Sequence, residues 1–330
     1  MSDSHPFRPS FEPRSADTAR PLWSVMIPTY NCAGYLRESL SSVLDQDAGR
    51  ADMQIEVVDD GSSDDPESVV DELAPGRVDF HRQARNTGHV HNLNTCIERS
   101  RGLLVHILHG DDAVRAGFYR AMADHLVDHP NVGAAFCRYI SMDAAGNWEA
   151  IGPLEPDGRG ILDDWLVRIA LGQRLQTPCM VVRRSVYERL GGFDARLTHS
   201  EDWEMWTRIA ASFPVSYEPE PLALYRVHAG SSSGRSRKVA ENVVDLRRTI
   251  EINREVLGAR ADEISDRALE ITATTAIRRA GRMLGAGDTE AARAQVREAL
   301  RTRRSPAVLE RAVLFGVLWA RHRLGRGAAR

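Results

Sequence analysis

The stretch that most constrains the fold is Leu103–Asp112, which reads LLVHILHGDD. Its apolar run is short and is bounded by Gly102 and Gly110, which is typical of a buried β-strand rather than of a helix. The strand leads directly into two adjacent carboxylates, Asp111 and Asp112. Ligands of open α/β sheets bind in the crevice beyond the carboxyl ends of the strands. The segment therefore predicts an α/β sheet with an acidic ligand site at one edge.

The two carboxylates predict a cation at this edge, because adjacent anions at a buried strand end repel each other. Carboxylate oxygens suit Mg²⁺ or Mn²⁺, which commonly use one or two carboxylates together with substrate phosphates. The alternative is a solvated turn in which an Asp caps the following helix, since Asp is favoured at helix N-caps. Both interpretations remain open for Asp111 and Asp112 taken alone.

Short apolar segments alternate with helical periodicity over the first two thirds of the chain. This rhythm predicts a mostly parallel sheet with helices on both faces and right-handed crossovers. Parallel strands share one carboxyl edge, so Thr29–Asn31, Asp60 and the Asp111–Asp112 pair are expected around one cleft. The expected strands are residues 23–28, 54–58, 78–81, 103–110, 132–140, 179–182 and 222–225.

Composition shifts divide the chain into three parts. Residues 1–20 are polar and proline-dotted, and we expect a disordered lead. Residues 21–235 form the predicted α/β domain, in which 141–157 is expected to be a mobile loop rich in Gly, Pro and Asp. Residues 236–330 are predicted to be a helical extension that includes one antiparallel helix pair over residues 276–300, broken at Gly285–Gly287.

The last apolar segment, residues 308–319, is framed by arginines and is too short to span a bilayer. It either lies on a membrane surface as a basic helix or packs back on the protein. The net charge of −3 gives no argument for nucleic acid. The four cysteines are far apart and form no CxxC pair, and the N-terminal residues contain no apolar signal core. We therefore expect the protein in a reducing cytoplasm, or at the inner face of the membrane in peripheral contact with it.

Six motifs occur in one order along residues 23–233, about two thirds of the chain. They are Pro28-Thr29-Tyr30-Asn31, residues 57–64 (VVDDGSSD), Asn86-Thr87-Gly88, His109-Gly110-Asp111-Asp112, Gly191-Gly192-Phe193-Asp194 and Glu201-Asp202. The two commonest phosphate cradles, the G-x-G-x-x-G loop and the P-loop, are missing from the sequence. With these six motifs in this order the sequence resembles a family 2 glycosyltransferase of the GT-A fold.

The resemblance implies a hexosyltransferase-like enzyme that uses a nucleotide-sugar donor, with UDP- or dTDP-sugars expected, and inverts the anomeric carbon. It also implies Mg²⁺ or Mn²⁺ and a saccharide, lipid-linked or small-molecule acceptor. Polysaccharide biosynthesis and natural-product decoration are both compatible. Carried over by position, Asp112 reaches the metal and Asp202 is the general base. The donor-binding residues are Pro28, Thr29, Tyr30, Asp60, Asp111, and Arg226 with His228 in a basic loop.

One position departs from the family pattern. The family often has Asp-x-Asp-Asp at the metal motif, and here His109 replaces the first Asp. His109 is either a metal ligand or a hydrogen-bonded residue at the strand end. The alternative function is therefore a non-catalytic nucleotide-sugar-binding or scaffold protein of the same fold. Trp203 and Trp206 either stack on a sugar or belong to the core, as tryptophans at helical spacing usually do.

Overall fold

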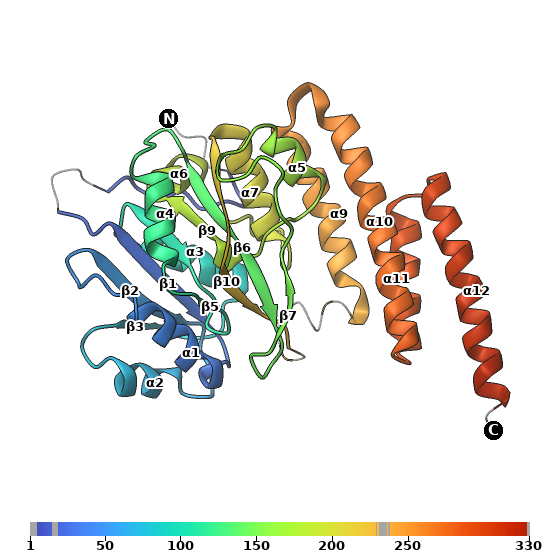
Figure 1. Ribbon diagram of the computed structural model, residues 1–330, viewed down its shortest axis with the longest axis horizontal. Helices are drawn as coiled ribbons and strands as arrows, with labels where there is room; N and C mark the ends of the chain where they lie inside the picture. Colours follow the sequence, from blue (N-terminus) through green and yellow to red (C-terminus); the bar gives the residue numbers. More distant parts are fainter. Residues whose placement is uncertain (1–4, 15–18, 229, 231–235, 237, 329–330) are drawn as a thin grey trace. The chain divides into compact units, whose positions relative to one another are not determined.

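The computed structural model describes residues 5–14, 19–228, 230, 236 and 238–328 (Figure 1). These residues divide into two compact units. The first unit lies within Met1–Trp165, Arg174–Arg196 and Arg208–Val227, and the second lies within Leu166–Gln173, Leu197–Thr207 and His228–Arg330.

The first unit is built on one sheet in which the structure defines ten strands. Eight of them follow the order β3-β2-β1-β4-β9-β6-β10-β5, with β7 paired to β6 and β8 paired to β10. Strands β3, β2, β1 and β4 are parallel, whereas β9 is antiparallel to both of its neighbours. The predicted mostly parallel α/β sheet is confirmed. The strands are β1 Trp23–Thr29, β2 Met53–Asp59, β3 Asp79–Arg82, β4 Leu104–Ile107, β5 Ala113–Val114, β6 Ala134–Met142, β7 Trp148–Ile151, β8 Gly160–Ile161, β9 Met180–Arg183 and β10 Val215–Arg226.

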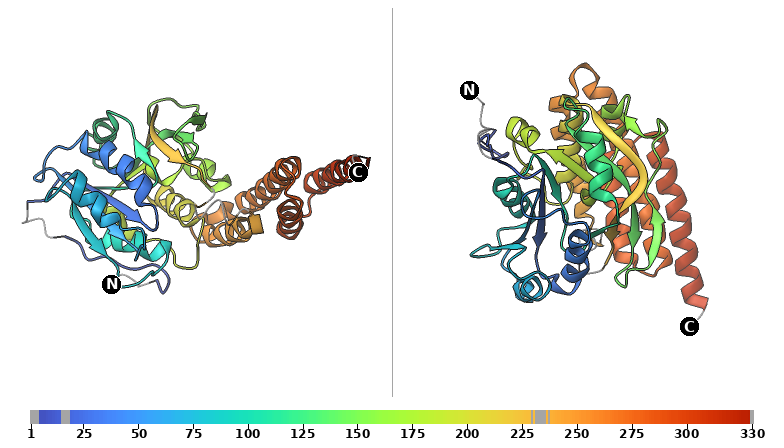
Figure 2. Two further views of the ribbon diagram at one scale, coloured as in Figure 1. Left: turned by 90° about the horizontal axis from the view of Figure 1, so that it is seen from below. Right: turned by 60° about the vertical axis from the view of Figure 1, so that its left-hand side comes forward.

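Helices cover both faces of this sheet (Figure 2). The crossovers from β1 to β2 and from β2 to β3 run in one direction, and the crossover from β3 to β4 runs back. Right-handed crossovers in opposite directions lie on opposite faces, so α1 and α2 share a face and contact each other, while α3 packs on β1, β2 and β4. The helices of this unit are α1 Ala33–Leu44, α2 Pro66–Leu73, α3 His89–Arg99, α4 Phe118–Leu126 and α6 Arg184–Leu190.

The strand order places a ligand crevice between β1 and β4. From β1 the chain moves outward to β2 and β3, and then returns to the opposite side of β1 as β4. Ligands of open α/β sheets bind at such switch points, beyond the carboxyl ends of the strands. Thr29 ends β1, and His109–Asp112 follows β4, so two of the predicted motifs lie at this place.

Two local expectations differ from the structure. The segment 141–157 was predicted to be a loop, but β6 continues to Met142 and pairs with β7 as an antiparallel hairpin. The Asp143 carboxylate closes the hairpin turn by accepting the N–H groups of Ala145 and Asn147. Within the predicted disordered lead, residues 5–14 make defined contacts: the Arg8 side chain donates to Asp194 at 2.9 Å.

The second unit is mainly helical. The predicted helix pair is confirmed, because α10 ends at Gly285 and α11 begins at Thr289 with Asp288 as its N-cap. The predicted boundary at 235/236 stays a prediction, and residues 231–235 lie outside the described residues. In the part of the chain that the structure describes, no helix is both long and apolar enough to cross a membrane. The helices are α5 Trp165–Leu171, which begins in the first unit, α7 Glu201–Ser212, which ends there, α9 Glu241–Asn253, α10 Ala261–Gly285, α11 Thr289–Thr302 and α12 Pro306–Ala328.

Candidate active site

The carboxylate pair after β4 is held close to the end of β1. The Gly110 N–H donates to the Pro28 carbonyl at 3.0 Å, which continues the β1–β4 pairing beyond the strand. A Cβ atom at Gly110 would lie 2.9 Å from Thr29 Oγ1 and 2.9 Å from Cys32 Sγ. Only glycine fits this approach without displacement, so the sequence H-G-D-D brings the acids against the β1 turn.

Asp112 is a buried carboxylate whose two oxygens differ in their surroundings. Its side chain is 2% exposed, and Oδ1 accepts the Arg226 N–H at 2.8 Å. Oδ2 lies 3.5 Å from His109 Nδ1 and has no hydrogen-bond partner among the described residues. Burial raises the pKa of Asp112 to about 6, a rise that His109 opposes and that the neighbouring Asp111 carboxylate increases.

These residues fit a divalent cation of the kind that completes its shell with substrate. A buried carboxylate oxygen without a donor fits a cation, and Asp111 is the adjacent, half-buried carboxylate. Among the described residues no group of three or more His, Cys, Asp or Glu side chains forms a metal cage. Mg²⁺ is commonly bound by one or two carboxylates plus phosphates, which is the donor set that Asp111 and Asp112 offer.

His109 lies next to Asp112, the second acid of the pair. Its Nδ1 faces Asp112 Oδ2, and its ring lies 5.1 Å from that of His89, centroid to centroid. This arrangement agrees with the interpretation of His109 as a residue that interacts at the strand end.

Arg226 was expected in a basic loop, and here the prediction was wrong. Arg226 is the last residue of β10 and is 3% exposed. Its backbone N–H binds Asp112, and its guanidinium donates to the Asp111 carbonyl at 2.9 Å and to the Glu38 carboxylate. The guanidinium also lies 4.8 Å from the Tyr35 ring centroid. Arg226 is thus a buried cross-link between β10, α1 and the carboxylate pair.

Sequence reasoning missed Glu38 and Tyr35. Both lie on α1, three residues apart, which places them on one helix face. This spacing was the only local signal, since their partner Arg226 is 188 positions away from Glu38.

Asp60 locks the turn that follows β3 to the end of β2. Asp60 is 2% exposed, and its Oδ1 accepts both the N–H and the hydroxyl of Thr87 at 2.7 Å, while Oδ2 accepts the Gly88 N–H at 3.0 Å. Gly61 has a φ of +76°, which L side chains adopt only with strain. The D-D-G-S sequence therefore folds as a tight turn that brings Asn86–Gly88 to the crevice.

The β1 turn supplies the other predicted donor residues. Pro28 and Thr29 are buried, and the Thr29 hydroxyl lies 2.8 Å from Cys32 Sγ. Tyr30 is 48% exposed. The first unit therefore brings together Pro28, Thr29, Tyr30, Asp60, Asp111, Asp112 and Arg226, whereas Asp202 and His228 belong to the second unit.

Asp202 lies in the first turn of α7 and is 7% exposed. Its Oδ2 accepts the Gln173 side-chain N–H at 2.6 Å, and Oδ1 accepts the Trp203 N–H at 2.7 Å. Trp203 and Trp206 are 1% and 2% exposed, so they belong to the core and not to a sugar-stacking surface.

Asp245 of α9, which the sequence did not indicate, fixes the turn that leads into α7. Its carboxylate accepts the His199 N–H at 2.9 Å and the Ser200 hydroxyl at 2.8 Å. The position of Asp202 thus depends on a residue more than forty positions further along the chain.

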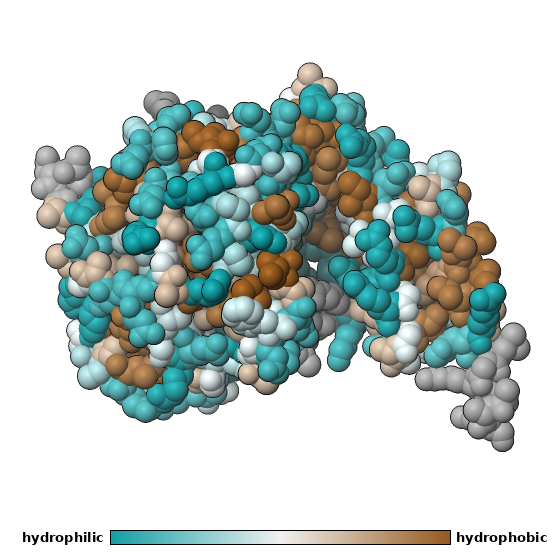
Figure 3. All heavy atoms as spheres, viewed as in Figure 1, coloured by the Kyte–Doolittle hydropathy of each residue, from teal (hydrophilic) through white to brown (hydrophobic). Residues whose placement is uncertain are grey.

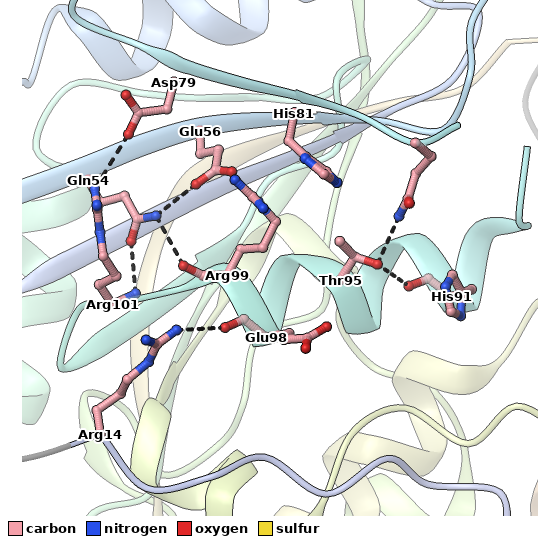
Figure 4. Close-up of a pocket in the computed structure, with 11 residues that line it drawn as sticks. Arg14, Gln54, Glu56, Asp79, His81, His91, Thr95, Glu98, Arg99 and Arg101 are labelled. Carbon is pink, nitrogen blue, oxygen red and sulfur yellow. Dashed lines mark hydrogen bonds and ion pairs between the residues drawn. The ribbon is translucent and has the colours of Figure 1, made fainter. Parts of the chain in front are cut away.

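A separate polar pocket of about 610 Å³ lies between α3 and strands β2 and β3 (Figure 4). It lies toward the amino ends of the strands, since Asp79 is the first residue of β3 and Gln54 the second of β2. Within it, Glu56 accepts from Arg99 and, at 2.9 Å, from Gln54. The pocket is therefore remote from the carboxyl edge of the sheet, and part of its polar lining is paired.

The comparisons agree with this geometry. Residues 24–191 match the family model described as Glycosyl transferase family 2. An uncharacterized protein of Mycobacterium tuberculosis is 29% identical over 248 residues, which cover 72% of this chain and 76% of the relative. An uncharacterized glycosyltransferase of Rickettsia prowazekii is 25% identical over 234 residues, which cover 68% and 70%.

Two solved structures share the fold. The mannosyltransferase PcManGT from Pyrobaculum calidifontis, in complex with GDP-Man and Mn²⁺, has a TM-score of 0.57 at 20% identity, covering 93% of this chain and 83% of that chain. S. aureus TarS 1-349 in complex with UDP-GlcNAc has a TM-score of 0.56 at 15% identity, covering 85% and 92%. The fold is the GT-A fold of glycosyltransferases. The chain belongs to glycosyltransferase family 2, as the sequence motifs predicted.

Proposed function

We propose that this glycosyltransferase moves a sugar from a nucleoside-diphosphate sugar, a UDP- or dTDP-sugar, to an acceptor hydroxyl with inversion. The observation that carries the proposal is the buried Asp112 carboxylate at the β1–β4 switch point, with one oxygen that makes no hydrogen bond among the described residues and lies 3.5 Å from His109 Nδ1. Solved structures of the same fold contain GDP-Man with Mn²⁺ and UDP-GlcNAc, which supports a nucleotide-sugar donor.

Asp112, with Asp111 beside it, would hold Mg²⁺ or Mn²⁺ against the donor diphosphate. When bound, the ion supplies Lewis-acid stabilisation of the charge that grows on the departing diphosphate. Arg226 serves this site by fixing both acids, through its N–H to Asp112 and its guanidinium to the Asp111 carbonyl. The Arg226 guanidinium is already bonded to Glu38. Arg226 would therefore act on the nucleotide sugar indirectly, by positioning Asp111 and Asp112.

Pro28, Thr29 and Tyr30 would line the nucleoside pocket, since Pro28 and Thr29 form the carboxyl end of β1 at the crevice and the exposed Tyr30 follows directly. Asp60 would accept a hydrogen bond from the base while it keeps its bonds to Thr87 and Gly88, because each carboxylate oxygen has more than one lone pair. His228 would approach the diphosphate.

Asp202 would act as the general base that takes the proton from the acceptor hydroxyl as that oxygen attacks the anomeric carbon. General base catalysis contributes typically about 10²–10⁴-fold. The hydrogen bond from Gln173 fixes the Asp202 side chain in one orientation, which reduces the entropy lost on reaching the reactive geometry. Glu201 next to it faces another direction, since adjacent residues of a helix do not share a face.

The decisive experiment incubates the full chain with a panel of nucleotide sugars and Mn²⁺ or Mg²⁺, and measures both donor binding and nucleoside-diphosphate release. We expect one donor class to bind and turn over, with loss of turnover in EDTA. Asp202→Asn should retain donor binding and lose turnover by at least about 100-fold. Glu201→Gln is the matched control and should retain most of the turnover.

Donor binding without turnover, with any acceptor tested, would favour the non-catalytic nucleotide-sugar-binding protein instead. Turnover that is unchanged in EDTA would remove the metal from the proposal. The stereochemistry of the product, read by NMR, tests inversion directly.

The acceptor is proposed to be a saccharide, a lipid-linked molecule or a small molecule, in polysaccharide building or natural-product decoration. We place the reaction in the cytoplasm, with peripheral attachment to the inner face of the membrane through the C-terminal helices.

A further inference from the structure

Helix α11 carries a row of arginines on one exposed face. Arg293, Arg297 and Arg301 follow each other at steps of four residues, which places them on one side of the helix, and Arg304 follows shortly after the helix ends at Thr302. The side chains of Arg297 and Arg301 are 65% and 61% exposed. Glu298 is the acidic neighbour of this row, and it lies 2.6 Å from Arg301.

The arginine row borders a groove with an apolar floor. The groove has a volume of about 510 Å³ and lies between α11 and α12. Its apolar members are Val296 and Leu300 from α11 and Phe315 and Trp319 from α12. The Arg293 guanidinium lies 5.9 Å from the Trp319 ring centroid. Cationic groups around an apolar floor suit an amphiphile that is anionic at its polar end.

Helix α12 also exposes apolar side chains outside the groove. Its packed row of Val308, Ala312, Phe315 and Trp319 belongs to the helical core of the second unit. Exposed apolar residues occur between and beside the members of this packed row. Figure 3 shows hydrophobic residues gathered along α12. The exposed members are Leu309 (46%), Val313 (68%), Leu314 (57%), Val317 (47%) and Leu318 (52%).

We propose that the α11–α12 surface binds the face of a bilayer that contains anionic phospholipids. Residues 289–322 contain seven arginines and three glutamates, so their charge complements headgroup phosphates. A helix with an exposed apolar side and flanking arginines lies in the interface plane rather than across the bilayer. A second copy of this chain is a poorer occupant, because a symmetric contact would bring the two arginine rows together.

The test is co-sedimentation of the full chain with vesicles, in the absence of donor and metal. Vesicles of phosphatidylcholine alone are compared with vesicles that contain 30 mol% phosphatidylglycerol, a composition chosen for about one anionic lipid in three. We expect binding to the anionic vesicles only, with release on raising the NaCl concentration to about 0.5 M. Binding is independent of the glycosyltransfer reaction, so a failed activity assay and a failed lipid assay are distinguishable.

Two pairs of variants locate the surface. Arg297→Gln/Arg301→Gln should weaken binding about 20- to 30-fold, at about fivefold for each arginine near an anionic surface. Arg260→Gln/Arg267→Gln removes two arginines of similar exposure, 52% and 58%, from outside the groove and should change binding less than twofold.

Val313→Ser/Val317→Ser should weaken binding at least tenfold, because the two exposed valine side chains transfer from water into the membrane on binding and serine loses this gain. Val244→Ser/Ile271→Ser is the matched control on α9 and α10, where the residues are 40% and 44% exposed. Circular dichroism of each variant establishes that the helices are retained.

Three results would overturn the proposal. The first is that the folded chain does not bind anionic vesicles. This result counts whether light scattering shows the chain to be monomeric or self-associated. The second is equal binding to neutral and anionic vesicles, which would remove the arginines from the interaction. The third is equal loss in the matched control variants, which would place the lipid contact elsewhere.

Discussion

Replacing Asp112 by Asn removes a negative charge that the fold buries next to another carboxylate. Asp112 Oδ1 accepts the Arg226 N–H, and the Asn side-chain oxygen preserves this bond. The amide group of Asn would then take the place of Oδ2, which makes no hydrogen bond among the described residues and lies 3.5 Å from His109 Nδ1. The substitution is nearly isosteric, so its effect on folding is mainly the removal of the charge.

The magnitude follows from the pKa of Asp112. Burial raises this pKa to about 6 from the ordinary value of 3.8, so the folded state disfavours the charged form. At 1.36 kcal/mol per pH unit, this difference costs the metal-free protein about 3 kcal/mol above pH 7. Between the two pKa values the folded state binds more protons than the unfolded state. The loss of stability is therefore nearly absent below about pH 4, grows between about pH 4 and pH 6, and is constant above that range.

The assay is urea unfolding of the wild-type chain and of Asp112→Asn in EDTA, at pH 7.5 and pH 5.0. We expect the variant to have the larger free energy of unfolding by up to about 3 kcal/mol at pH 7.5, and by about half that amount at pH 5.0. With Mn²⁺ and donor the order should reverse, because only the wild type gains binding energy from the loaded site.

The matched control is Asp59→Asn. Asp59 is also fully buried, but it accepts from Ser62 and from the Arg82 guanidinium at 2.9 Å. Its replacement should destabilise the protein by about 1–3 kcal/mol, since charged hydrogen bonds are lost. The reasoning about Asp112 is refuted if, in EDTA at pH 7.5, the free energy of unfolding of Asp112→Asn is equal to or smaller than that of the wild type.

Three further substitutions test the frame around the site. Gly110→Ala introduces a Cβ 2.9 Å from Thr29 Oγ1 and should cost about 1–3 kcal/mol in urea unfolding and raise the Kd for donor, whereas unchanged values would contradict the close packing. Asp60→Asn turns its amide group toward a donor, the Gly88 N–H when the Asn oxygen stays on Thr87, and should cost about 2 kcal/mol and weaken donor binding by calorimetry; a neutral result would mean that the turn does not depend on this carboxylate. Asp245→Ala removes the acceptor from the turn before α7 and should cost about 3 kcal/mol and lower kcat more than it changes KM; a change in KM alone would contradict its positioning role.

The strand ends and the acidic motif were predictable because their signals are local. A short apolar run bounded by glycines predicts a buried strand, and parallel strands necessarily share one carboxyl edge. The order of motifs from Pro28 to Asp112 therefore predicts that these residues share one edge of the sheet. The break at Gly285–Gly287 likewise divides α10 from α11, since glycine ends a helical pattern.

The environment of each acid was decided only by the tertiary structure. Arg226 looked like part of a basic loop, yet it ends β10 because the pairing of that strand with β6 continues, past two register shifts near Pro221, to Arg226 opposite Met142. Which groups surround the Asp112 carboxylate, and whether Asp202 is held by Gln173, depends on residues that the fold brings together from distant positions. Patterns of hydrophobicity specify which face of a helix or strand is buried. They carry no information on which polar side chains from distant positions form hydrogen bonds with each other. The sequence by itself thus determined the sheet and the place of the site, and long-range packing determined the partners and hence the chemistry of its residues.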